Sequence, residues 1–164
     1  MPMSGFLKSE RLCHFHLRHM LFAARQDFFC YPFRIAYLAF FPGREENILV
    51  PSAPLHDKIA GKTPPVNAGT FATFPAQCLI TVSSKRFRKA TQRNRIKRLV
   101  REAYRKNKSG FYAFLSDREM FCLVAFIYSA GEILPFSEIE SKMTVSLHTL
   151  MKKLHAQHGA NIQK

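Results

Sequence analysis

The sequence predicts a single mixed α+β domain, and three observations support this. With 164 residues, 47% of them hydrophobic, the chain is long enough to form one domain with a real core. Three segments have the length and the apolar or alternating pattern of β-strands, and three others have the 3.6-residue period of amphipathic helices. In chain order the expected elements are helix, strand, strand, helix, strand and helix. We therefore treat residues 1–164 as one domain.

The first two elements lie in the N-terminal quarter. Residues 7–24 fit an amphipathic helix, and the side chains expected near its apolar side are Leu12, Phe15, His16, His19, Met20 and either Phe22 or Ala23. The sequence "FFCYPFRIAYLAFF" follows, and we predict a strand in the part after Pro32, where large apolar residues alternate with others. Proline has no backbone N–H, so Pro32 suits the start or the edge of a strand.

Residues 42–75 differ from the rest of the chain. They hold six of the nine prolines and three of the seven glycines, and they show no sustained periodicity. A structureless loop of this length is unusual within a compact domain. We interpret it as a flexible insertion, with a short strand possible at "NILV".

The remaining strands and the last helix follow the insertion. "QCLITVSS", residues 77–84, predicts a second strand. "MFCLVAFIY", residues 120–128, is almost continuously apolar, as expected of a strand covered on both faces. Residues 135–158 predict a helix with an apolar stripe formed by Phe136, Ile139, Met143, Leu147, Leu150, Met151 and Leu154.

The segment from Lys85 to Lys108 contains twelve basic residues and one acid, Glu102, so it carries +11 of the chain's net charge of +14. This many like charges repel one another unless a polyanion compensates them, which points to nucleic acid. A membrane is the weaker alternative, because no apolar run approaches the ~20 residues needed to span a bilayer. The N-terminus also lacks the clean apolar block of a secretory signal, so we expect a cytoplasmic protein.

A helical wheel shows how the strongly basic segment can still pack against a core. Ile96, Leu99, Val100, Ala103 and Tyr104 fall within about 80° of one another, while the basic side chains spread over the remaining arc. The pattern predicts a helix that docks one side on a sheet and presents a cationic outer side. Arg93 falls near the apolar edge of the wheel, so we place it at or before the helix start.

The sequence "KATQRNRIKRLVREAYR", Lys89 to Arg105, closely resembles the RNR signature of the protein component of bacterial ribonuclease P. "TVSSKRFRKA" before it resembles that family's strand end and basic turn. "LKSERL" and "FFCYPFRIAYL" resemble its first helix and first strand. The resemblance implies a two-layer α/β sandwich with a central, mostly antiparallel sheet, like the second domain of ribosomal protein S5.

The resemblance also implies a function. In that family the RNA subunit, with bound Mg²⁺, removes the 5′ leader from precursor tRNA. The protein docks on the catalytic RNA through its RNR side, and a cleft beside its first helix holds the leader. No catalytic residue and no obligatory protein partner would then be expected in this chain. The implied RNA contacts are Ser84, Lys85, Lys89, Arg93, Asn94, Arg95, Lys97, Arg98, Arg101 and Arg105. The candidate aromatics for the leader cleft are Phe22, Phe33 and Tyr37.

Several simpler interpretations of these residues and of the function are also open. Phe22, Phe33 and Tyr37 could each belong to the core rather than to a cleft. His14, His16 and His19, with Cys13 nearby, could suggest a metal site, but only His16 and His19 have the spacing to share a helix face, so we expect none. The protein could also be a non-catalytic RNA-binding or ribosome-associated protein, or place its basic helix in a DNA groove. The four scattered cysteines predict buried thiols rather than disulfides.

Overall fold

The computed structural model describes residues 5–41 and 74–162. Within them lies one four-stranded sheet in the order β1-β2-β4-β3, in which β3 pairs with β4 in parallel and the other neighbours are antiparallel. This confirms the predicted α+β class and the mostly antiparallel sheet. The elements in chain order are the 3-10 turn η1 (Lys8–Glu10), α1 (Phe15–Ala23), β1 (Asp27–Cys30), β2 (Phe33–Phe40), β3 (Ala76–Val82), α2 (Ala90–Asp117), β4 (Phe121–Tyr128) and α3 (Phe136–Ile162).

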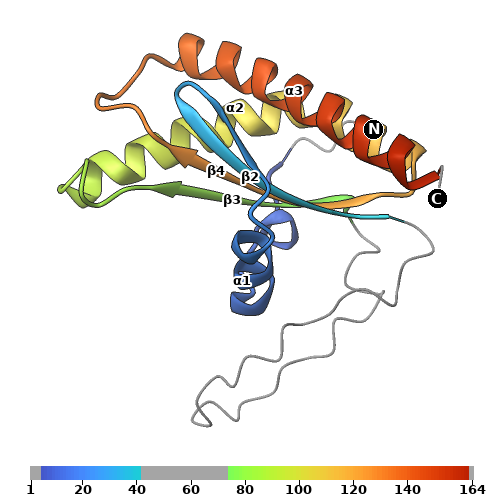
Figure 1. Ribbon diagram of the computed structural model, residues 1–164. Coiled ribbons are helices and arrows are strands. Elements are labelled where there is room, and N and C mark those ends of the chain that lie inside the picture. The colour runs from blue at the N-terminus through green and yellow to red at the C-terminus, as the bar shows by residue number, and fades with distance from the viewer. Residues whose placement is uncertain (1–4, 42–73, 163–164) are drawn as a thin grey trace, which may run out of the picture.

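The two faces of the sheet are covered unequally (Figure 1). The long helices α2 and α3 lie side by side on one face, and their apolar sides bury Ile96, Val100, Tyr104, Met143 and Leu150 against it. Among the described elements, the opposite face carries the short helix α1. Its Leu17, Met20 and Leu21 pack on residues of β2 and β4 in a second, smaller apolar cluster. Much of that second face therefore has only α1 to cover it among the described elements.

The N-terminal segment departs from the single helix predicted for residues 7–24. Only Phe15–Ala23 is α-helical. Arg11 forms a parallel bridge with Cys78 of β3, and the backbone N–H of Leu12 donates to the Cys78 carbonyl at 3.0 Å. Long-range hydrogen bonds to a sheet edge thus outweigh the local helical pattern. The buried side of α1 is also different, because Leu17 and Leu21 are buried while Phe15 and Phe22 are exposed.

Strand β1 was not predicted. It is short, and it pairs with β2 in a hairpin whose turn contains Pro32. Its four residues alternate between exposed and half-buried, which is a weak signal for a strand at a sheet edge. The other strands and α3 lie within a few residues of their predicted positions. The predicted insertion, with its possible "NILV" strand, lies almost entirely outside the described residues.

Candidate RNA-binding surface

Helix α2 presents the cationic side that the helical wheel predicts. Ile96, Val100, Ala103 and Tyr104 are fully buried beneath it. Leu99 is only partly buried, at the margin of the core. On the outer side, Arg95 and Arg98 are exposed, and Lys97 and Arg101 are partly exposed. The apolar stripe therefore fixes the rotation of the helix and turns these basic groups outward.

The turn before α2 continues this surface. Ser84, Lys85 and Lys89 are exposed, while Phe87 between them is buried in the core and its N–H donates to the Ser83 carbonyl at 3.1 Å. The buried Phe87 anchors a short loop in which Ser84, Lys85, Arg88 and Lys89 are exposed. We define the cationic face as the turn and outer helix residues Lys85, Lys89, Arg95, Lys97, Arg98 and Arg101.

Arg93 lies within the first turn of α2 rather than before the helix. One of its guanidinium nitrogens, Nη1, donates to the carbonyls of Phe87 and Arg88 at 2.7 Å each. Arg93 therefore braces the turn against the helix. Asn94, next to it, is exposed.

Three of the twelve basic residues differ from the expectation of an open cationic side. Lys106 forms an ion pair with Glu140 of α3 at 2.9 Å. Lys108 is buried, and its ammonium group donates to the Glu10 carboxylate and to the Gly5 carbonyl. Arg105 forms an ion pair with Glu102 at 2.7 Å, one helical turn away. Lys108 must therefore be removed from the predicted cationic surface. Arg105 stays at its edge with part of its charge compensated.

The buried pair of Glu10 and Lys108 has further partners. The Leu7 N–H donates to Glu10 at 2.6 Å and the Tyr112 hydroxyl donates at 2.7 Å. Burial by itself raises the pKa of Glu10, but these donors and the Lys108 ammonium together hold it below its ordinary value. The cluster ties residues 5–10 to the middle of α2. We call it the N-terminal clamp, formed by Gly5, Leu7, Glu10, Lys108 and Tyr112.

Arg101 lies where the cationic face meets the N-terminal segment. Its Nε atom is buried without a hydrogen-bond partner among the described residues. Burial lowers the pKa of Arg101, and the nearby charges of Arg11 and Arg98 lower it further. Guanidinium groups that repel one another in a partly desolvated place favour a bound anion.

A groove lies between α1 and the edge strand β3. Its volume is about 680 Å³, and its walls include Phe15, Arg18, His19 and Phe22 from α1, Leu79 and Thr81 from β3, and Lys97 from α2. Phe15 and Phe22 are 67% and 45% exposed, so their rings are open to a ligand. The Nε atom of Arg18 is buried without a partner in the described part of the chain. The groove thus combines ring faces with cationic groups.

The structure separates the three candidate cleft aromatics. Phe22 lies in the groove. Phe33 and Tyr37 are buried on the opposite face of the sheet, against α2 and α3, with the Phe33 ring packed edge-on to Phe126 at 5.7 Å. Phe33 and Tyr37 are therefore core residues here, because strand alternation directs both toward the helices. Phe15, which we predicted only for the apolar side of the first helix, lines the groove together with Phe22.

Histidines near the groove do not assemble a metal centre. Among residues 5–41 and 74–162, no group of three or more histidine, cysteine or acidic side chains could hold a metal ion. His14 and His19 are exposed and His16 is partly exposed. No helix in these same ranges is long and apolar enough to cross a membrane.

Comparison with known proteins decides the family. A sequence model of the ribonuclease P family matches residues 19–153, which include the second half of α1, the whole of α2 and the four described strands. The chain belongs to the ribonuclease P protein family. It resembles a ribonuclease P protein component from Porphyromonas gingivalis, with 32% identity over 146 residues that cover 89% of this chain and 86% of the relative. A ribonuclease P protein component from a second strain is 45% identical over 69 residues, which cover 42% of this chain and half of that relative.

Membership of the ribonuclease P protein family defines the general function. The chain is a protein subunit of ribonuclease P, an endoribonuclease that acts in tRNA processing. Membership also implies association with the ribonuclease P RNA. The alternatives of a ribosome-associated protein and of a DNA-binding helix have no support from these relatives. The observed α+β architecture agrees with the fold that the sequence resemblance implied.

Proposed function

We propose that the cationic face docks this subunit on the catalytic RNA, and that the groove between α1 and β3 holds the 5′ leader of precursor tRNA. The observation that carries the proposal is the placement of an open cationic helix side next to a groove with exposed aromatic rings. Lys97 belongs to both, so one RNA-bound assembly could occupy the two surfaces together. Arg101 and Arg18, one in each region, carry buried N–H groups without partners among the described residues, which suits phosphate acceptors.

Each surface has a distinct task in this proposal. Arginine and lysine side chains of the cationic face neutralise RNA phosphates and release counterions, which makes the affinity depend steeply on salt. In the groove, Phe15 and Phe22 offer ring faces on which unpaired bases can stack without strong sequence preference. The protein thus raises affinity for a substrate that carries a single-stranded leader and aligns it with the RNA. Bond cleavage needs no side chain of this chain.

Mg²⁺ is the cofactor that the family resemblance implies, and we propose that the RNA holds it. Mg²⁺ prefers oxygen ligands, usually carboxylates together with phosphate oxygens. The cationic face and the groove present lysine and arginine, which repel Mg²⁺, and histidine, whose nitrogen atoms are not its preferred ligands. The donor set around the proposed RNA contacts therefore does not fit a magnesium site. Because its substrate would be precursor tRNA, we also place the protein in the cytoplasm.

Reconstitution with the catalytic RNA tests the proposal. We expect the protein to increase cleavage of precursor tRNA at low Mg²⁺. Arg98→Ala should weaken binding to the catalytic RNA and reduce the salt slope, the change of log affinity with log salt, by about one unit. Lys152→Ala, a matched exposed cation on α3, is the control and should change neither quantity. No gain in cleavage, or equal effects of both substitutions, would contradict the proposal.

A leader-length series separates the two surfaces. Phe22→Ala should weaken binding of precursor tRNA with a leader, but not of mature tRNA, because only the leader reaches the groove. A loss of about 1–3 kcal/mol is expected for one stacked base. Equal losses for both substrates would argue against leader binding in the groove.

A further inference from the structure

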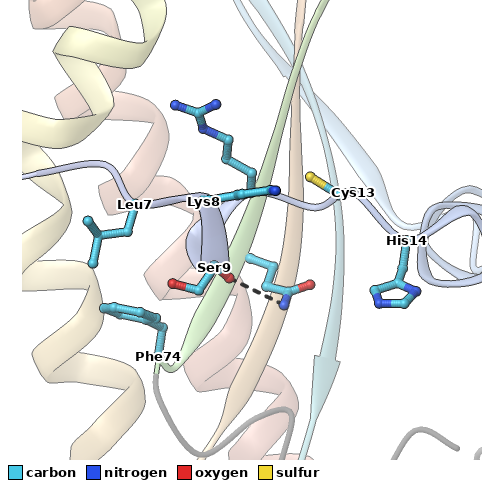
Figure 2. A pocket seen from close by; sticks show the side chains of 8 residues that line it. Leu7, Lys8, Ser9, Cys13, His14 and Phe74 are labelled. Carbon is cyan, nitrogen blue, oxygen red and sulfur yellow. Dashed lines mark hydrogen bonds between the residues drawn. The ribbon is translucent and has the colours of Figure 1, made fainter. Parts of the chain in front are cut away.

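A second pocket lies at the other end of the N-terminal segment, between η1, residues 11–14 and the start of β3 (Figure 2). Its volume is about 640 Å³, within the usual range for small-ligand sites. The pocket and the groove that we propose for the leader have no described lining residue in common. The lining residues are Leu7, Lys8, Ser9, Arg11, Cys13, His14, Phe74 and Gln77.

Gln77 supplies the most specific feature of this pocket. The residue is only 8% exposed, and its Nε2 donates to the backbone carbonyl of Ser9 at 3.4 Å, the bond drawn in Figure 2. Because the Ser9 carbonyl can only accept, this bond fixes which way the amide points. The other amide atom, Oε1, is buried without a partner among the described residues. A buried acceptor without a donor costs stability, so its presence in a pocket wall points to a ligand that donates an N–H or O–H.

The charges around the pocket favour an anionic ligand. Lys8 and Arg11 line it, and none of its described lining residues is acidic. The acid nearest in sequence, Glu10, is directed into the N-terminal clamp and neutralised there by Lys108. Arg11 is held in place, since its backbone bridges β3 and its guanidinium lies 5.6 Å from the Phe6 ring centroid. The cations of the pocket are therefore not compensated by its own walls.

The pocket also has an apolar side. In Figure 2, Leu7 and Phe74 lie together at one end, while Cys13 and His14 lie at the other. A ligand that fills the pocket thus meets an apolar surface, a fixed hydrogen-bond acceptor and two cations. A nucleotide combines the matching groups, because its phosphate is anionic, its base has a flat apolar face, and the edge of each base carries N–H donors.

We propose that this pocket binds one nucleotide of RNA, with the phosphate at Lys8 and Arg11 and an N–H of the base donating to Oε1 of Gln77. The inference rests on the proposed function as an RNA-binding subunit and adds a third contact region to it. The region is continuous with the cationic face through Arg11, whose charge acts on Arg101. The nucleotide belongs either to the catalytic RNA or to precursor tRNA, and the experiments below distinguish these sources.

Gln77→Leu is the first test, because it keeps the shape of the side chain and removes the acceptor. We expect about fivefold weaker binding to one of the two RNAs, as for the loss of one hydrogen bond. The melting temperature should change little, because the substitution removes the long hydrogen bond to the Ser9 carbonyl together with an unpaired buried oxygen. A purely structural role for Gln77 predicts the reverse, with a lower melting temperature and unchanged affinity.

Lys8→Ala tests the anionic part of the ligand. The salt slope of binding should fall by about one unit for the RNA that supplies the nucleotide. Lys152→Ala on α3 is again the matched control. Measuring each variant against the catalytic RNA alone, and then against precursor tRNA with the assembled holoenzyme, assigns the nucleotide to one source.

The exposed thiol of Cys13 gives a direct probe, because Cys13 lines the pocket and Cys78 and Cys122 are buried. In a Cys30→Ser background, a short photo-crosslinker attached to Cys13 should form a crosslink to the catalytic RNA or to precursor tRNA in the holoenzyme. The same reagent at Lys152→Cys, in a protein that also carries Cys13→Ser, reports the background.

The inference is overturned if Gln77→Leu and Lys8→Ala bind both RNAs like the unmodified protein and Cys13 crosslinks no more than the control position. If Arg98→Ala still weakens binding in that case, the proposed function stands without the pocket. If Arg98→Ala also has no effect, the proposed function itself fails.

Discussion

Replacing Lys108 with methionine tests whether the N-terminal clamp is a buried structural pair. Lys108 and Glu10 are both almost completely buried, so methionine would keep the length of the side chain but leave the Glu10 carboxylate without its counter-ion. Removing one partner of a buried pair costs about 3–5 kcal/mol. Glu10 would keep two donors, the Leu7 N–H and the Tyr112 hydroxyl, so we expect the lower end of this range, about 3 kcal/mol.

Thermal and urea unfolding measure this loss. For a protein of this size, about 3 kcal/mol corresponds to a fall in melting temperature of about 6–12 °C. The double variant Glu10→Gln with Lys108→Met should recover part of the stability, because no uncompensated charge remains, and the thermodynamic cycle gives the coupling between the two side chains.

The Lys108→Met variant also distinguishes a Lys108 buried in the N-terminal clamp from a Lys108 that belongs to the cationic face. If Lys108 were part of the cationic face, Lys108→Met would reduce the salt slope of RNA binding by about one unit, as we expect for Arg98→Ala. We expect no change in that slope at a temperature where the variant is folded. A loss of stability below about 0.5 kcal/mol together with a reduced salt slope would refute the clamp.

Three further predictions follow from the burial of particular residues. Phe33→Ala should cost about 3–5 kcal/mol of stability as a fully buried ring, whereas Phe22→Ala should change stability little; chemical unfolding of the two variants compares them. Because the pKa of Glu10 is lowered in the folded protein, the stability it adds is complete above its ordinary value of 4.5 and is lost as the pH falls through the lower folded value, so Glu10→Gln should flatten the acid side of a stability–pH curve. Burial raises the pKa of Cys122 to about 12, so a thiol reagent at neutral pH should modify exposed Cys13 rapidly and Cys122 only after unfolding; rapid reaction of both in the native protein would contradict the assigned burial.

Sequence reasoning succeeded where the signal was local and strong. The stripe of Ile96, Val100, Ala103 and Tyr104 repeats at helical spacing, so the rotation of α2 and the direction of its basic side chains could be predicted. The strands with long apolar runs were predicted for the same reason. The residues that match the ribonuclease P family model, 19–153, include all of α2.

The errors arose where distant residues decide the structure. Lys108 looks like one more charge in a basic run, and nothing nearby reveals that its partner is Glu10, 98 residues earlier. Alternation in β2 predicts that Phe33 and Tyr37 share a face, but it does not say which face meets the long helices. The N-terminal helix was overextended because the hydrogen bond from Leu12 to Cys78 is invisible to local periodicity.

The long sequence separation between Glu10 and Lys108 constrains the order in which parts of the chain can fold during synthesis on the ribosome. Synthesis is directional, so residues 5–12 emerge long before β3 and α2, the elements to which they attach. The bridge of Arg11 to Cys78 can form only after residue 78 has left the exit tunnel, and the clamp can form only after residue 108 has done so. Closing such long loops is entropically slow. Residues 5–12, which are made before the elements they attach to, are thus among the last to reach their final positions, and the pocket that they line acquires its shape only then.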